Sequence, residues 1–241
     1  MTVSKRDAKY HTYADYYVWS RTYGDELIDG VAWVREPPSP AFSHQAIALK
    51  MVSQLERALD NTPWRVHIAP LDVRLPKSTE PDDDVDTVVQ PDVFITKGVE
   101  KIDKRGIRGA PDWLAEILSP STARHDRNRK IPVYERAGVL EVWLIDFSKR
   151  TVAIYRLSDG QYGTPTIVKL EGRTQLTAVP GAEVQWAPII ARALEVPDPP
   201  DANDPDGNGP DANAPDANDA DGDAPNANDA NANDAGSSDR Q

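Results

Sequence analysis

Residues 197–241 contain no aromatic residue, Leu, Ile or Phe, and consist almost wholly of Asp, Asn, Ala, Pro and Gly. A segment of this composition cannot bury enough apolar surface to offset the entropy that it would lose on ordering. It therefore confines the folded part of the chain to residues 1–196, a length typical of one domain. We predict a single folded domain over residues 1–196, followed by an acidic disordered tail over residues 197–241.

The negative charge of the chain is concentrated in this tail. The tail has 12 Asp and one Arg, a net charge of −11, and the whole chain has −12, which leaves −1 for residues 1–196. The acidity is thus no argument against nucleic acid as a substrate of the folded part. The simplest interpretation of the tail is a solvated spacer.

Composition excludes several other classes of protein. The chain has no Cys, so disulfides, thiolate metal sites and cysteine nucleophiles are all excluded. No apolar run approaches the roughly 20 residues that span a bilayer, and residues 1–7 lack the apolar region of a signal peptide. We expect a cytoplasmic protein that does not bind membranes.

The residue pattern before the middle of the chain predicts a hairpin and a long helix. Residues 8–20 have the aromatic spacing of a short helix, and residues 26–34 read as two strands that turn at Asp29-Gly30. A longer helix follows, in which four apolar residues recur every four positions: Ile47, Met51, Leu55 and Leu59.

The rest of the domain alternates between strands and one further helix. We predict that helix over 121–137, closed by Gly138 and interrupted by Pro132. The predicted strands are 65–75, 87–96, 112–118, 141–146 and 151–157, with peripheral strands within 162–187. From Phe42 onward the order is α-β-β-β-α-β, which indicates an α/β (α+β) fold with a mixed sheet and helices packed on it.

Two acidic residues lie within apolar stretches that we predict to be strands. Asp92 follows Val88-Val89-Gln90-Pro91, and Glu116 lies in the middle of Trp113–Leu118. A buried carboxylate is costly unless it is paired or binds a metal ion. If the two strands are neighbours, the carboxylates meet, and a hard cation such as Mg²⁺ would relieve their repulsion. The alternative is that each acid pairs separately with an Arg or Lys.

Lys130 is the third candidate for the same site. Val133, Tyr134 and Ala137 share its stripe on the predicted helix, which faces the core. A lysine there can direct its ammonium group to the acids and stabilise negative charge on a phosphoryl group. The alternative, which spacing alone favours, is a side chain that extends its ammonium group to solvent, and the kink expected at Pro132 could turn it away.

Several segments of the chain resemble, in order, successive motifs of the Uma2 restriction endonuclease family. The resemblance covers residues 10–187. The matching segments are Glu26-Leu27-Ile28-Asp29-Gly30, Ser39-Pro40 with His44-Gln45, Val88-Val89-Gln90-Pro91-Asp92, Gly109-Ala110-Pro111-Asp112-Trp113, Glu116-Ile117-Leu118-Ser119-Pro120-Ser121-Thr122, and Lys130, Tyr134 and Gly138 with Glu141-Val142-Trp143-Leu144.

This resemblance implies a PD-(D/E)XK nuclease fold, with an αβββαβ core, an N-terminal hairpin and peripheral C-terminal strands. It further implies a Mg²⁺- or Mn²⁺-dependent endonuclease that hydrolyses phosphodiester bonds of DNA. By position, Asp92 and Glu116 match the two metal-binding catalytic acids. Leu118 replaces the usual lysine two residues after the second acid, and Lys130 matches the position that takes over its role. Glu26 matches a third acid of the metal shell, and His44 matches a polar contact near it.

Two functional hypotheses from different classes remain open at this point. The first is the DNA endonuclease. The basic loop 97–109 could contact phosphates or could equally be a solvated loop, whereas the group Arg124, Arg127 and Arg129 favours a polyanionic substrate. The second is a module that keeps the nuclease fold and binds nucleic acid or protein without cutting. DNA is the expected partner of the first, and a homodimer is compatible with both.

Overall fold

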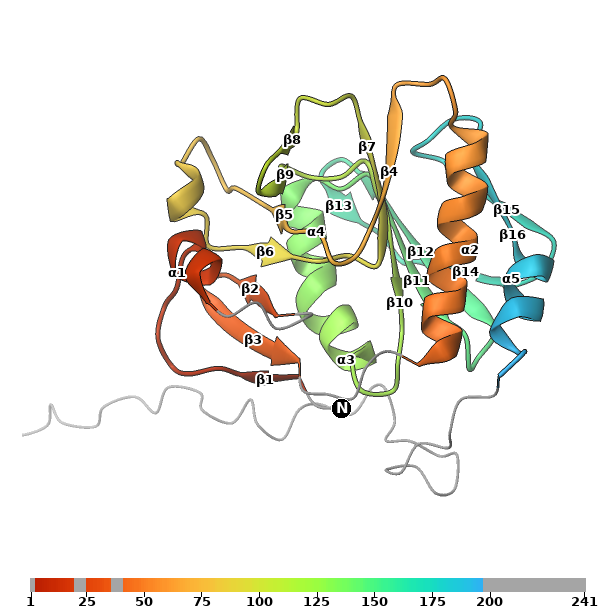
Figure 1. The fold of residues 1–241 in the computed structure, drawn as a ribbon, viewed down its shortest axis with the longest axis horizontal. Coiled ribbons are helices and arrows are strands. Elements are labelled where there is room, and N and C mark those ends of the chain that lie inside the picture. The colour runs from red at the N-terminus through yellow and green to blue at the C-terminus, as the bar shows by residue number, and fades with distance from the viewer. Residues whose placement is uncertain (1–2, 20–24, 36–40, 197–241) are drawn as a thin grey trace, which may run out of the picture.

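The computed structural model describes residues 3–19, 25–35 and 41–196, which form two seven-stranded β-sheets, a two-stranded sheet and the helices around them (Figure 1). The predicted acidic tail lies outside the described residues. The fold is the mixed α+β architecture that the sequence predicts. No helix in the described ranges is long and apolar enough to cross a membrane.

Both main sheets have seven strands, and the one with the longer strands is called the larger sheet. Its strand order is β13-β12-β11-β10-β7-β4, with β14 pairing on β12. β10 lies at its centre, antiparallel to β7 and parallel to β11. The strands are β4 (Trp64–Ile68), β7 (Val93–Lys97), β10 (Trp113–Ile117), β11 (Glu141–Asp146), β12 (Thr151–Ser158), β13 (Gln161–Tyr162) and β14 (Thr166–Lys169).

Helices cover both faces of this sheet. Figure 1 shows α2 (Phe42–Ala58) on one side of the central strands, and α4 (Ile131–Ala137) on the other. α5 (Trp186–Ala193) and the two-stranded sheet of β15 (Arg173–Gln175) and β16 (Glu183–Gln185) pack beside α2. α4 continues from α3 (Ala123–His125) and from a π-helical segment, η2 (Asp126–Lys130), and ends at Gly138, whose φ of 85° is left-handed.

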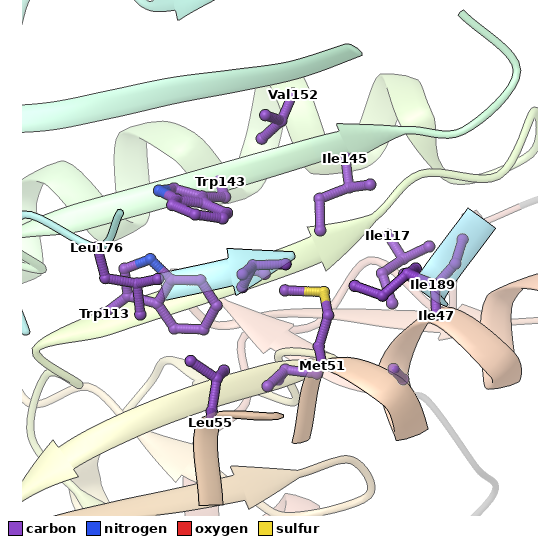
Figure 2. Packing of buried hydrophobic residues seen from close by; sticks show 14 of the residues in the cluster. Ile47, Met51, Leu55, Trp113, Ile117, Trp143, Ile145, Val152, Leu176 and Ile189 are labelled. Carbon is purple, nitrogen blue, oxygen red and sulfur yellow. The ribbon is translucent and has the colours of Figure 1, made fainter. Parts of the chain in front are cut away.

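The main hydrophobic core lies between α2 and the larger sheet (Figure 2). Met51 and Leu55 from α2 are fully buried, and the rings of Trp113 and Trp143 meet edge to face with their centroids 5.2 Å apart. The four-residue apolar period thus predicts the buried face of α2 correctly. A second core, which includes Leu114 and Tyr134, lies between the other face of the sheet and α4.

The second sheet packs against the α4 side of the molecule, and its strand order is β1-β3-β2-β6-β5-β9-β8. The predicted turn at Asp29-Gly30 is confirmed, because both residues have positive φ angles, 50° and 77°. The strands are β1 (Val3–Lys5), β2 (Glu26–Ile28), β3 (Val31–Arg35), β5 (Val73–Arg74), β6 (Val88–Val89), β8 (Ile102–Asp103) and β9 (Gly106–Arg108).

Two segments that were each predicted to be one strand form two strands instead. Residues 65–75 divide into β4 and β5, and residues 87–96 divide into β6 and β7, with each pair of fragments in different sheets. Pro70 and Pro91 lie at the two breaks, and a proline has no N–H with which to continue a ladder. The pattern predicts that Asp92 lies inside a strand, but Asp92 lies immediately before β7.

Three smaller predictions also need correction. The helix expected over 8–20 is only α1 (Tyr13–Val18). The basic loop 97–109 contains a hairpin, β8–β9, which pairs with β5 and extends the second sheet. The peripheral strands are followed by α5, which the pattern does not predict. Pro188 lies in the first turn of α5, where a missing N–H costs no helical hydrogen bond.

Candidate functional site

Glu116 projects from the centre of the larger sheet toward α4. Side chains alternate along β10, so Trp113, Ala115 and Ile117 join the core beneath α2, while Leu114 joins the core beneath α4. Glu116 is on the same face as Leu114 and is 2% exposed. A carboxylate at this depth needs partners, and the tyrosine hydroxyl of Tyr134 donates a hydrogen bond to its Oε1.

Asp92 lies immediately before the neighbouring strand, β7, at the level of Glu116. The antiparallel register of β7 and β10 pairs Val93 with Ala115, so one further step places Asp92 opposite Glu116. The backbone N–H of Ile117 donates to Asp92 Oδ2 over 2.7 Å. His44 Nε2, from α2, lies 3.2 Å from the same oxygen.

Lys130 is fully buried, so the alternative of a solvent-exposed ammonium group is wrong. Its Nζ lies 2.7 Å from Glu116 Oε1 and 2.9 Å from Glu26 Oε1, with Asp126 Oδ1 at 3.5 Å. Burial alone would lower the pKa of Lys130, but the carboxylates of Glu116, Glu26 and Asp126 raise it well above its ordinary value. The ammonium group is therefore charged and serves as the central cation of the cluster.

The local backbone explains how Lys130 reaches this position despite Pro132. The π-helical turns of η2 end at Lys130, and Pro132 falls in the first turn of α4, where a proline is tolerated. The backbone passes from α3 through η2 into α4 as one continuous helical segment. Single π-helical turns within α-helices are frequent at functional sites.

The pKa values of Glu116 and Asp92 are shifted in opposite directions. Burial raises the pKa of the Glu116 carboxyl to about 8 against the opposing charge of Lys130, and Asp126 and Asp92 add to the rise. Burial also opposes ionisation of Asp92, but His44 and Lys130 outweigh it and lower the pKa of its carboxyl. Paired carboxyl groups with divergent pKa values are typical of sites that handle protons.

Glu26 belongs to the same cluster but has other partners than the resemblance implies. Its Oε2 lies 2.8 Å from His125 Nε2, while its Oε1 contacts Lys130. Sequence reasoning missed His125, since no spacing connects it with a residue 99 positions away. Asp126 and Tyr134 were within reach of such reasoning, because both lie four positions from Lys130.

The donor set bears on the metal ion that the family implies. Among the described residues, no group of three or more His, Asp or Glu is arranged to hold a metal ion. Asp92 Oδ1 and Glu116 Oε2 nevertheless accept no hydrogen bond from the described part of the chain. Two carboxylates that each retain such an oxygen fit a hard cation, which takes its remaining ligands from water and substrate.

The basic side chains of the loop 97–109 are less available to bind an anion than the sequence indicates. In the loop 97–109, Arg105 pairs with Asp83, Arg108 pairs with Asp82, and Lys101 donates to a backbone carbonyl. The two arginine ion pairs hold β8–β9 to η1 (Asp82–Asp84).

Comparison with known proteins identifies a family and a similar fold. The family described as "Uma2: Putative restriction endonuclease" matches residues 13–191. One similar solved structure is described as a "putative nuclease belonging to DUF820 from Anabaena variabilis ATCC 29413". It is 20% identical, with a TM-score of 0.54 over 70% of this chain and 91% of that chain, a likeness that shows the fold. The curated proteins contain no match.

Proposed function

Because the chain belongs to the Uma2 family, we propose that it is a metal-dependent endonuclease that hydrolyses phosphodiester bonds of DNA. The observation that carries this proposal is the buried ammonium group of Lys130, 2.7 Å from Glu116 on the strand beside Asp92. A charged lysine and two acids at one point of a sheet are costly to bury. Such a cluster is expected where negative charge develops during a reaction.

In this proposal Asp92 and Glu116 hold a Mg²⁺ or Mn²⁺ ion. The ion would supply an activated water molecule and a positive charge beside the phosphate. His44 and the N–H of Ile117 fix the carboxylate of Asp92, and Tyr134 fixes that of Glu116. Lys130 supplies a positive charge beside the acids that can stabilise a phosphate oxygen as the negative charge on it increases. Glu26 and His125 keep Lys130 in place.

Cleavage of supercoiled plasmid and of a short labelled duplex, across a titration of Mg²⁺ and of Mn²⁺, tests the proposal. We expect the wild type to nick DNA, and Asp92→Asn, Glu116→Gln and Lys130→Met each to lose about 100-fold or more of that rate. Glu141→Gln is the matched control. Glu141 is also a buried acid on the larger sheet, but its carboxylate accepts hydrogen bonds from Trp143, Thr177 and Ala178.

The same assay distinguishes a second candidate, a non-catalytic binding module. The observation that favours the module is the ion-pair cluster itself, because Lys130 already neutralises carboxylates that would otherwise need a metal ion. Binding of the duplex without cleavage at any metal concentration would support the module. Equal cleavage by wild type and the Asp92→Asn variant would show that the activity does not arise at this site.

A further inference from the structure

A groove of about 270 Å³ lies between the second sheet and the helical segment that carries Lys130. One wall comes from β1 and the β2–β3 hairpin and includes Lys5, Asp29 and Trp33; the other comes from η2 and α4 and includes Arg129 and Arg136. Its volume is near the lower end of small-molecule sites, about 300–1,000 Å³. The groove therefore has room for one base.

The groove is positively charged. Lys5, Arg129 and Arg136 line it, and Asp29 is the carboxylate among the lining residues. Asp29 is already neutralised by Arg136 at 2.7 Å and by Lys77 at 2.9 Å. Lys5 is exposed and makes no ion pair within the described part of the chain, so its charge is available to an anion.

Trp33 gives the groove an aromatic surface between these cations. Its ring is half-buried, with Lys5 Nζ 5.9 Å and the Arg129 guanidinium carbon 5.6 Å from its centroid. Both cations lie over the ring, so a base would stack on it by displacing the exposed side chain of Lys5, which would then be free to contact a flanking phosphate. Aromatic stacking together with basic side chains is the usual way in which proteins bind single-stranded nucleic acid.

The groove adjoins the candidate site through two short contacts. Trp33 pairs with Glu26 in the register of β2 and β3, and its ring lies 5.1 Å from that of His125, centroid to centroid. His125 and Glu26 connect in turn to Lys130. A strand held in the groove would therefore pass beside the carboxylate cluster.

We propose that this groove binds an unpaired base of single-stranded DNA beside the phosphodiester bond that is cut. The base stacks on Trp33, while Lys5 and Arg129 bind the phosphates on either side of it. The bases of a duplex are stacked on one another, so their faces are not free for an indole ring. The inference rests on the proposed nuclease function and names the form of DNA that this function would act on.

Equilibrium binding without any divalent metal tests the inference separately from cleavage. The probes are a fluorescein-labelled 12-residue oligo(dT) and a labelled 12-base-pair duplex, measured by anisotropy in EDTA with the full chain. We expect oligo(dT) to bind more tightly than the duplex. Trp33→Ala should weaken oligo(dT) binding by about 5- to 100-fold, the effect of losing one stacked base, and Trp33→Phe should weaken it less.

Trp64→Ala is the matched control, because Trp64 is also half-buried with a lysine, Lys97, 5.6 Å from its ring, but lies on β4 outside the groove. It should bind oligo(dT) like the wild type. Lys5→Gln with Arg129→Gln provides a second test that leaves Trp33 in place. That variant should reduce the slope of log affinity against log salt by about 0.7 for each phosphate contact removed.

Two results would overturn the inference: duplex binding as tight as that of oligo(dT), or an unchanged affinity for oligo(dT) in folded Trp33→Ala and in the double glutamine variant. Neither result depends on a metal ion. Failure of the proposed nuclease function would appear instead as absence of metal-dependent cleavage in the plasmid assay. The two ideas can therefore fail separately.

Discussion

Replacing Lys130 by Met tests whether its ammonium group holds the carboxylate cluster together. Methionine has a similar length and can fill the same space, so the change removes the charge and leaves the packing largely intact. The wild-type ammonium group lies within 2.9 Å of both Glu116 and Glu26, and 3.5 Å from Asp126. All three carboxylates are buried and would lose their shared counter-charge.

The expected loss of stability is large for a single substitution. Removing one partner of a buried ion pair leaves an uncompensated charge and costs about 3–5 kcal/mol. In a domain of this size each kcal/mol lowers Tm by about 2–4 °C, so we expect a decrease of roughly 6–20 °C. At a pH above the Glu116 pKa of about 8, adding Glu116→Gln to the Met variant removes one of the unpaired charges. The double variant should therefore be more stable than additivity predicts, by about 1 kcal/mol or more.

Urea denaturation in EDTA, followed by tryptophan fluorescence, measures both effects. Lys149→Met is the control, because Lys149 Nζ lies 3.8 Å from Asp146 and its side chain is 65% exposed. That variant should remain within about 0.5 kcal/mol of the wild type. If Lys130→Met changes the free energy of unfolding as little as Lys149→Met does, the ammonium group does not hold the cluster, and our reasoning about the site is wrong.

Three further predictions concern the metal ion, the core and the tail. Excess Mg²⁺ or Mn²⁺ should raise the Tm of the wild type without DNA, because an ion at 100 times its Kd stabilises a folded protein by about 2.7 kcal/mol; an equal rise in Asp92→Asn would place the ion elsewhere. In urea denaturation, Met51→Ala should cost about 2–5 kcal/mol and Leu49→Ala, on the exposed face of α2, under about 0.5 kcal/mol; similar costs would contradict the packing. Removal of residues 197–241 should leave the Tm within about 2 °C and strengthen DNA binding at low salt only, since the segment carries a charge of −11; an unchanged low-salt affinity would show that the tail does not compete.

Elements whose pattern repeats over several turns or residues could be predicted from the sequence. The apolar period of α2 continues through the whole helix, and the β2–β3 turn needs only the positive φ angles that Asp29-Gly30 adopts easily. β10, β11 and β12 also agree with their predicted ranges to within one residue. In each case the information is local, and burial in the fold reinforces the local preference.

The division of two predicted strands between different sheets could not be predicted in the same way. The apolar runs 65–75 and 87–96 each look continuous, because apolar residues occur on both sides of each break. Pro70 and Pro91 mark the breaks, but a proline within a run indicates either an edge strand or an interruption. Only the pairing partners decide between these, and β5 and β6 pair with strands from distant parts of the chain, such as β9 and β2.

The candidate site shows the same limit at the level of single residues. Asp92 and Glu116 stand out because acids are rare in apolar runs, and that signal needs no knowledge of the fold. The direction of Lys130 is different, because it depends on one π-helical turn before Pro132, and a side chain turns by about 100° for each residue of helical register. The contact of Glu26 with His125 joins residues 99 positions apart, and no local pattern encodes it. The sequence therefore reveals which side chains are costly to bury, whereas the fold determines which of them neutralise one another. The alternative interpretation, in which each acid pairs separately with a cation, is therefore correct for Glu116, which pairs with Lys130. This pair is compatible with a metal ion between Glu116 and Asp92.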